Sequence, residues 1–179
     1  AIRFCLEQSG STLNGFDAVA FYDKPFLKFE RLLETYFAAA PKGFATFVEA
    51  MPIWIREKLF LKKVIKSELA KIEKFDGKKI KLFFPEHHLS HAASSYYPSP
   101  FQEAAIITID GVGEWTTTAY GVGNGNNIKL LKEIKFPHSL GLLYSTITAY
   151  LGFSVNNSEY KVMGLSPYGN MNPKTNEYY

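Results

Sequence analysis

Three consecutive strand-like segments in the second half of the chain constrain its fold most strongly. The segments 104–110, 116–123 and 128–136 are rich in apolar and β-branched residues, and turns containing glycine and asparagine separate them. Turns of this composition join neighbouring antiparallel strands. We therefore expect a three-stranded antiparallel meander. The helix-like segments that flank it place the chain in the α/β class, with a mixed sheet.

Helical periodicity and short apolar runs alternate over the first hundred residues, as is typical of α/β domains. Pro52 is expected to begin a new helix, because proline fits the first helical turn. A later helix is expected to pack on the meander through Leu143, Ile147 and Tyr150. The expected helices are 1–9, 26–40, 44–75 with its interruption, 87–97 and 142–151. Before the meander we expect a short buried strand at 17–22 and a strand at 79–84 that alternates at first and then enters a core. Residues after Gly169 are expected to form a loop.

Three of the four histidines lie between residues 87 and 91. On a helix, His87 and His91 share one face, with Cβ atoms about 5–6 Å apart, and His88 is rotated away from it. Asp110 ends a strand, the position where open α/β sheets bind ligands. Imidazole and carboxylate groups bind several divalent metals, so this pattern predicts a metal site without choosing the metal. Histidines at this spacing also occur on ordinary helices, and that alternative stays open.

A glycine-rich turn follows Asp110. Gly111 and Gly113 let backbone N–H groups approach an anion closely, and the hydroxyls of Thr116 and Thr117 add donors. The pattern suggests a metal that holds a phosphorylated ligand. The alternative is an ordinary hairpin turn, for which Asp-Gly is a leading signal.

Composition narrows the class of protein. The chain has 179 residues, of which 46% are hydrophobic and 21% charged, which is typical of a globular domain. It has no apolar run long enough to span a bilayer, so no membrane partner is expected. Cys5 is the single cysteine, which fits a reducing compartment and predicts a cytoplasmic protein. A lysine-rich helix face is the best support for a nucleic-acid partner, but a net charge of only +3 makes solvation its more ordinary role.

Five runs of residues, in order along the chain, point to one family. They are F-D-A-V-A-F-Y-D-K-P-F-L-K-F-E-R from Phe16, H-H-L-S-H-A-A-S-S-Y-Y-P-S-P-F from His87, D-G-V-G-E-W-T-T-T from Asp110, F-P-H-S-L-G-L-L-Y-S from Phe136 and E-Y-K-V-M-G-L-S-P-Y-G from Glu159. The chain resembles the O-carbamoyltransferases, which include nodulation and antibiotic-tailoring enzymes.

The resemblance implies part of a catalytic domain with the duplicated actin/Hsp70/sugar-kinase-like (ribonuclease H-like) fold. Residues 1–103 would form the end of the first half, with a helical insertion and the histidine helix, and residues 104–179 the start of the second half. The resemblance also implies ATP and carbamoyl phosphate as substrates. An adenylate-forming domain of the same parent chain would make carbamoyl adenylate, and the carbamoyl group would pass to the hydroxyl of a small-molecule acceptor, a sugar or a natural-product scaffold.

Matched residue by residue, the resemblance implies that His87, His91 and Asp110 bind the metal, for which iron is expected. For His138 a structural hydrogen bond is the alternative to a site role, and for Lys161 it is a surface pair with Glu159. We assign no general acid or base. The residues expected to bind the nucleotide or carbamoyl adenylate are Gly111, Gly113, Glu114, Thr116, Thr117, His138, Lys161 and Gly164.

The chain departs from the family pattern at both ends. The family's opening strands and a distal aspartate have no counterpart here, so we expect an internal piece of a larger enzyme that is inactive alone. Two rival functions stay open. One is a tRNA threonylcarbamoyl-transferase on the same fold, and the other is a non-catalytic scaffold that binds a metal or nucleotide.

Overall fold

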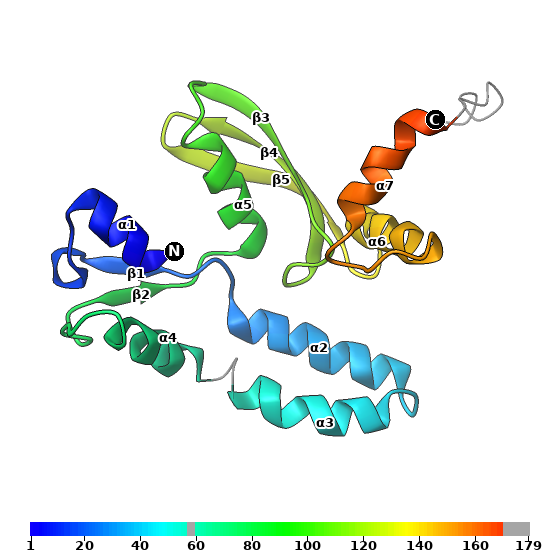
Figure 1. Cartoon of the computed structure of the whole chain (residues 1–179), viewed down its shortest axis with the longest axis horizontal. Helices are drawn as coiled ribbons and strands as arrows, with labels where there is room; N and C mark the ends of the chain where they lie inside the picture. The colour runs from blue at the N-terminus through cyan, green and yellow to red at the C-terminus, as the bar shows by residue number, and fades with distance from the viewer. Residues whose placement is uncertain (57–59, 170–179) are drawn as a thin grey trace.

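The computed structural model describes residues 1–56 and 60–169 of the chain. Residues 57–59, inside the expected helical region 44–75, and the expected loop after Gly169 lie outside the described residues. Two small sheets and the helices around them make up the described part, which confirms an α/β chain (Figure 1). The actin-like fold stays a prediction, as does the division at residue 103.

The first sheet has two short parallel strands, β1 (Ala18–Ala20) and β2 (Lys81–Phe83), paired from Ala18 with Lys81 to Ala20 with Phe83. The expectation that the first strand is buried is wrong, because exposed residues lie on both sides of the half-buried Val19. In β2, too, exposed residues lie on both sides of a half-buried one. Helix α1 (Ile2–Ser9) precedes them and ends at Gly10, whose φ of 61° suits glycine. The short 3-10 helix η1 (Leu13–Gly15) lies between α1 and β1.

Three helices separate β1 from β2: α2 (Pro25–Ala39), α3 (Phe44–Trp54) and α4 (Leu61–Ala70). Helices α2 and α3 lie side by side (Figure 1), and the Tyr36 ring packs against those of Phe47 and Trp54 at centroid distances of 5.2 and 5.7 Å. Pro52 lies inside α3 and does not begin a new helix. The prediction fails because the helix continues past the proline, where the N–H of Ile55 still donates to the carbonyl of Met51.

The second sheet is the expected meander. Its strands β3 (Glu103–Ile109), β4 (Thr116–Asn124) and β5 (Asn127–Lys135) pair antiparallel in the order β3–β4–β5, each within one residue of its predicted bounds. Helix α5 (His87–Tyr96) lies across one face, where Ala92, Tyr96 and Ile106 form a buried cluster. Helix and sheet approach so closely that a Cβ at Gly123 would lie 2.5 Å from the Tyr96 ring.

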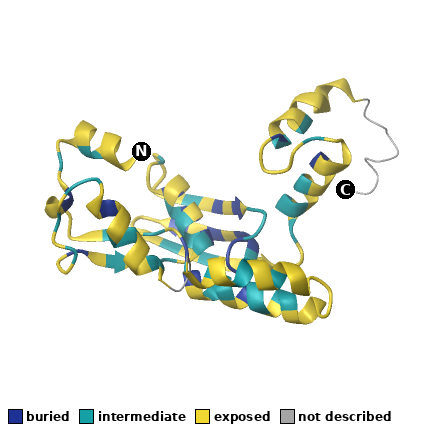
Figure 2. Cartoon of the chain, turned by 60° about the horizontal axis from the view of Figure 1, so that its bottom comes forward, coloured by how far each residue is buried: buried dark blue, intermediate teal, exposed yellow. Residues whose placement is uncertain are grey.

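The opposite face of this sheet is apolar and exposed. Along β3, Ile106 and Thr108 are buried under α5, whereas Ile107 and Ile109 are 68% and 55% exposed. In Figure 2 much of the helix surface is also exposed (yellow), and many of the buried residues (dark blue) lie along the strands. The helix–sheet contact is therefore the main packed interface of the described chain.

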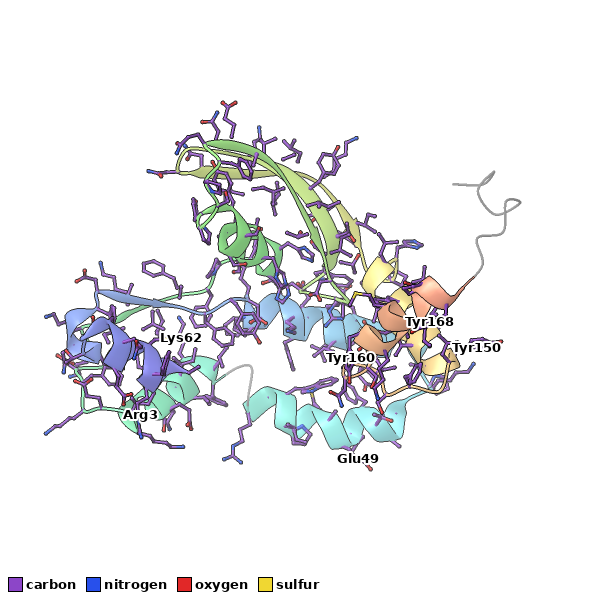
Figure 3. The ribbon with its side chains drawn as sticks, turned by 45° about the horizontal axis from the view of Figure 1, so that its top comes forward. Arg3, Glu49, Lys62, Tyr150, Tyr160 and Tyr168 are labelled. Atoms are coloured by element: carbon purple, nitrogen blue, oxygen red, sulfur yellow. The ribbon has the colours of Figure 1, made fainter. Side chains whose placement is uncertain are left out.

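Helices α6 (Leu140–Tyr150) and α7 (Glu159–Leu165) and the short 3-10 helix η3 (Ser166–Tyr168) follow the meander. The expected packing of α6 through Leu143, Ile147 and Tyr150 is wrong, because these side chains are 55%, 44% and 89% exposed. Tyr150 projects outwards in Figure 3. The contact with the meander comes instead from the first turn of α6, where a Cβ at Gly141 would lie 2.4 Å from the carbonyl oxygen of Asp110.

No helix among residues 1–56 and 60–169 combines the length and the apolar character needed to cross a bilayer.

Candidate functional site

Three predicted ligands meet where α5 begins and β3 ends. His87 and His91 lie one helical turn apart on α5, and Asp110 follows the last residue of β3. The Nε2 atom of His87 lies 2.8 Å from Oδ2 of Asp110 and 3.0 Å from Nε2 of His91, and the distance from His91 Nε2 to Asp110 Oδ2 is 3.8 Å. All three ligand atoms therefore lie within 4.8 Å of one another.

This geometry fits a metal ion. Two ligand atoms that each bind a divalent ion at about 2.0–2.2 Å are separated by roughly 3–3.5 Å, and the three observed distances are close to this range. Two nitrogens and one carboxylate oxygen form a donor set that suits iron, zinc and related ions. The exposed fractions of the His87, His91 and Asp110 side chains are 11%, 49% and 32%, so the cluster is open on the side of His91.

The ring of His87 is held by packing. A Cβ at Gly113 would lie 2.8 Å from Cδ2 of His87, so only glycine lets the ring lie this close to the loop. The Tyr22 ring also packs against His87 edge-on, at a centroid distance of 5.8 Å. Within the described residues, the second ring nitrogen, Nδ1, is buried and has no hydrogen-bond partner. Packing and the contacts of Nε2 therefore orient this ring, whereas metal-binding histidines commonly also donate a hydrogen bond from the nitrogen that does not bind the metal.

The surroundings of Asp110 favour the ionised form of its carboxyl group. Burial raises the pKa of its carboxyl group, but the hydrogen bond from the Gly111 N–H, at 2.7 Å, and the contact with His87 together outweigh this and hold the pKa below its usual 3.8. The carboxylate is therefore ionised at neutral pH and available to a cation.

The backbone N–H groups of both loop glycines, Gly111 and Gly113, already donate hydrogen bonds within the chain. The Gly111 N–H donates to Asp110, and the Gly113 N–H donates to the carbonyl of Thr116 at 3.0 Å. The loop closes on itself through these bonds, and an anion would have to find other donors. The predicted role of the two glycines in phosphate binding stays a prediction.

Glu114 is directed at the start of α5. Its side chain is buried, and its carboxylate accepts hydrogen bonds from the N–H of Lys24, at 2.5 Å, and from the N–H of His87. Burial raises its pKa above 4.5, and these two bonds oppose the shift. A carboxylate at a helix N-terminus satisfies free N–H groups and the positive end of the helix dipole. Glu114 thereby holds His87 at its backbone.

Thr116, Thr117 and His138 take part in hydrogen bonds within the chain. The Thr116 hydroxyl donates to Glu133 at 2.5 Å. The fully buried Thr117 hydroxyl contacts the carbonyl oxygens of Ile134, at 3.1 Å, and His138, at 2.6 Å. The His138 contact uses its main chain, and its side chain is exposed. Their predicted ligand roles are untested predictions.

Lys161 and Gly164 lie apart from the histidines, on α7, which packs against α6. The Lys161 ammonium is 5.8 Å from the centre of the Phe153 ring. Among the described residues, no atom outside the local helix backbone lies within 4 Å of a Cβ built at Gly164. Figure 3 shows Tyr160 and Tyr150 at this end of the molecule. The structure therefore brings His87, His91, Asp110, Gly113 and Glu114 together, and it does not bring Lys161 or Gly164 to them.

Two supporting residues escaped the sequence reasoning. Ser139 caps α6 by accepting from the Leu142 N–H at 3.0 Å, and its hydroxyl contacts the Gly111 carbonyl at 2.6 Å. Gly141 permits the close approach to Asp110 described above. A serine before an apolar helix is a recognisable N-cap signal, but no local pattern shows that the cap also binds the aspartate loop.

His88 is a third residue whose supporting contacts the sequence reasoning missed. It is 3% exposed, and both ring nitrogens contact the sheet. Burial lowers its pKa, and the nearby cationic forms of His87 and His91 act in the same direction, although the hydrogen bond to Thr116 opposes them. Its ring is therefore neutral at neutral pH.

Comparison with known proteins gives a consistent result. A family profile described as the N-terminus of carbamoyltransferases matches residues 1–178. An uncharacterised protein of Synechocystis is 54% identical over 169 residues, which cover 94% of this chain and 28% of that protein. The nodulation protein NolNO of Sinorhizobium fredii is 35% identical over 97% of this chain and 23% of its own length.

A second nodulation protein, NolO of Bradyrhizobium diazoefficiens, is 41% identical over 83 residues, which cover 46% of this chain and 15% of that protein. The chain thus spans about a quarter or less of the length of these relatives.

Proposed function

Because the chain belongs to the carbamoyltransferase family, we propose that it forms part of the catalytic domain of an O-carbamoyltransferase. The transferred carbamoyl group comes from carbamoyl adenylate and goes to the hydroxyl of a small-molecule acceptor. The observation that carries this proposal is the cluster of His87, His91 and Asp110 within a chain that the family profile matches from residue 1 to 178.

The three clustered side chains would hold a divalent metal ion, with iron expected. When bound, such an ion supplies Lewis-acid charge that stabilises negative charge on an oxygen of the substrate. His87 and His91 offer imidazole nitrogens, and Asp110 offers the anionic oxygen that its hydrogen bond from Gly111 keeps ionised. Gly113 and Glu114 hold His87 in place from the loop and from the backbone.

The reaction balances without a redox step. The acceptor oxygen forms a bond to the carbamoyl carbon, the bond from that carbon to the phosphate oxygen of the adenylate breaks, and AMP leaves with the electron pair. The hydroxyl proton passes to a base, which we do not assign among the described residues. The positive end of α6, whose first turn lies against Asp110 and Gly111, favours a nearby phosphate.

The preceding step belongs to another part of the intact protein. There, carbamoyl phosphate, ATP and one water molecule give carbamoyl adenylate, phosphate and pyrophosphate. Residues 1–179 alone would then be inactive, because they lack the adenylate-forming domain. Carbamoyl transfer by a purified protein that consists of these residues only would contradict this division.

The test is pyrophosphate release by the intact protein given ATP and carbamoyl phosphate, with no acceptor. Release that requires carbamoyl phosphate supports the proposal, since adenylate formation needs no acceptor. No release from folded, metal-loaded protein refutes it. Activity that depends on tRNA and threonine would identify the threonylcarbamoyl chemistry instead.

A further inference from the structure

We propose that His88 is a positioning residue of the metal centre, which fixes α5 to the two strands that flank the Asp110 loop. The inference rests on the proposed function, because it concerns the same centre. His88 lies between the two predicted metal ligands of α5 but turns away from them, into the interface between the helix and the sheet.

The hydrogen bonds of His88 define its tautomer. Its Nε2 lies 2.9 Å from the carbonyl oxygen of Thr116, which can only accept, so Nε2 carries the hydrogen. Nδ1 therefore accepts from the Thr108 hydroxyl, at 2.7 Å. Both nitrogens are used, so His88 cannot bind a metal without giving up one of these bonds.

The two partners of His88 lie on either side of the site loop. Thr108 stands two residues before Asp110 on β3, and Thr116 is the first residue of β4. The loop between them contains Asp110 and also Gly113, whose N–H is bonded to the Thr116 carbonyl that His88 contacts. One buried ring thus connects the histidine helix to both ends of the loop that carries the third ligand.

His87 needs such support from its helix. Its second ring nitrogen, Nδ1, has no hydrogen-bond partner within the described residues, so the ring is bonded only through Nε2, to the other two members of the cluster. The ring is directed by contact with Gly113 and by the position of α5. A shift or rotation of α5 would carry His87 and His91 away from Asp110 together, and the bonds of His88 oppose that movement.

The experiment measures Co²⁺ binding by the intact protein, by titration and from the visible absorption of the bound ion. His88→Leu keeps an apolar side chain and removes both hydrogen bonds, and it should weaken Co²⁺ binding about 10- to 100-fold, as for other outer partners of metal ligands. His88→Gln restores an N–H donor and should recover part of the affinity. Thr108→Val removes the bond to His88, and with it the longer contact of the same hydroxyl with the Ala119 carbonyl at 3.4 Å, with little change of volume, and it should weaken binding about 3- to 10-fold.

Two controls separate positioning from general destabilisation. Tyr96→Phe removes the 2.7 Å bond from the Tyr96 hydroxyl to the Gln102 carbonyl, in the same helix–sheet interface but two turns further along α5. This variant should bind Co²⁺ like the wild type. Thermal unfolding of every variant is the second control and is measured alongside.

The outcomes distinguish the two proposals. Normal Co²⁺ affinity in folded His88→Leu, or in Thr108→Val if leucine prevents folding, overturns the positioning role alone. Equal weakening by Tyr96→Phe also overturns it, because loss of affinity would then follow loss of stability. A wild-type protein that binds no Co²⁺ overturns the metal centre itself.

Discussion

The replacement Gly113→Ala tests the proposed metal centre with a single added methyl group. The new Cβ would lie 2.8, 3.0 and 3.2 Å from Cδ2, Cγ and Cβ of His87. Carbon atoms are in optimal contact at about 3.5–4.0 Å, so the ring would have to move by several tenths of an ångström or more. Because His87 Nε2 is the atom closest to both other ligands, this movement acts directly on the site.

The expected size of the effect follows from the packing. An extra methyl group in a tightly packed place costs about 1–3 kcal/mol, which corresponds to a factor of about 5 to 150 in affinity if the free protein relaxes the clash and metal binding restores it. We expect Co²⁺ or Fe²⁺ binding by the intact protein to weaken within this range, with only a small decrease in the melting temperature.

Gly111→Ala is the matched control for this variant. It adds the same methyl group two residues away, where the nearest atom, Cδ2 of Leu142, is 3.8 Å from the new Cβ, and it keeps the N–H that bonds to Asp110. Metal binding should stay at the wild-type value. Equal affinities of the two variants, measured by calorimetry, would refute the argument that Gly113 makes room for a ligand ring.

Three further predictions concern the same site and its supports. His91→Ala removes one of three clustered ligands, and the metal content of the purified intact protein should fall, while unchanged content would count against the assignment. Ser139→Ala removes the cap of α6 and should lower the unfolding free energy by about 1 kcal/mol, and an unchanged denaturation midpoint would contradict this. The hydrogen bond from the Asn156 N–H, with those from Ser158 and Ser145, holds the pKa of Glu159 below its usual 4.5. Its stabilising effect is present above pH 4.5 and is lost as the pH falls through the lower folded value, so α7 amides should lose exchange protection there in the wild type but not in Glu159→Gln.

Local patterns predicted the second half of the fold well. The predicted bounds of the three meander strands agree with the observed bounds within one residue, because glycine and asparagine turns leave few other places for the strands to end between residues 104 and 136. The meeting of His87, His91 and Asp110 also followed from helix spacing and a strand end. Both signals act over a few residues, which is the range that sequence patterns describe.

The failures are contacts that depend on tertiary structure. Periodicity marked Tyr150 and Ile147 as packing residues, but the glycine at 141 directs the first turn of α6 to the meander and leaves those side chains exposed. The spacing that placed His88 away from the metal face was right about direction. The spacing could not predict the contacts of His88 with Thr108 and Thr116, because these partners lie 20 and 28 residues away and leave no local signal.

The closeness in sequence of the three clustered ligands has a consequence for folding. His87 and Asp110 are separated by only 23 positions, and the chain between them forms a helix and an adjacent strand. The entropic cost of closing a loop rises with its length, and a loop of this size forms quickly. The cluster is therefore a local structure that can assemble early in folding, before contacts form between distant parts of a long chain. A metal ion present at that moment would bias the chain towards the native helix–sheet pairing.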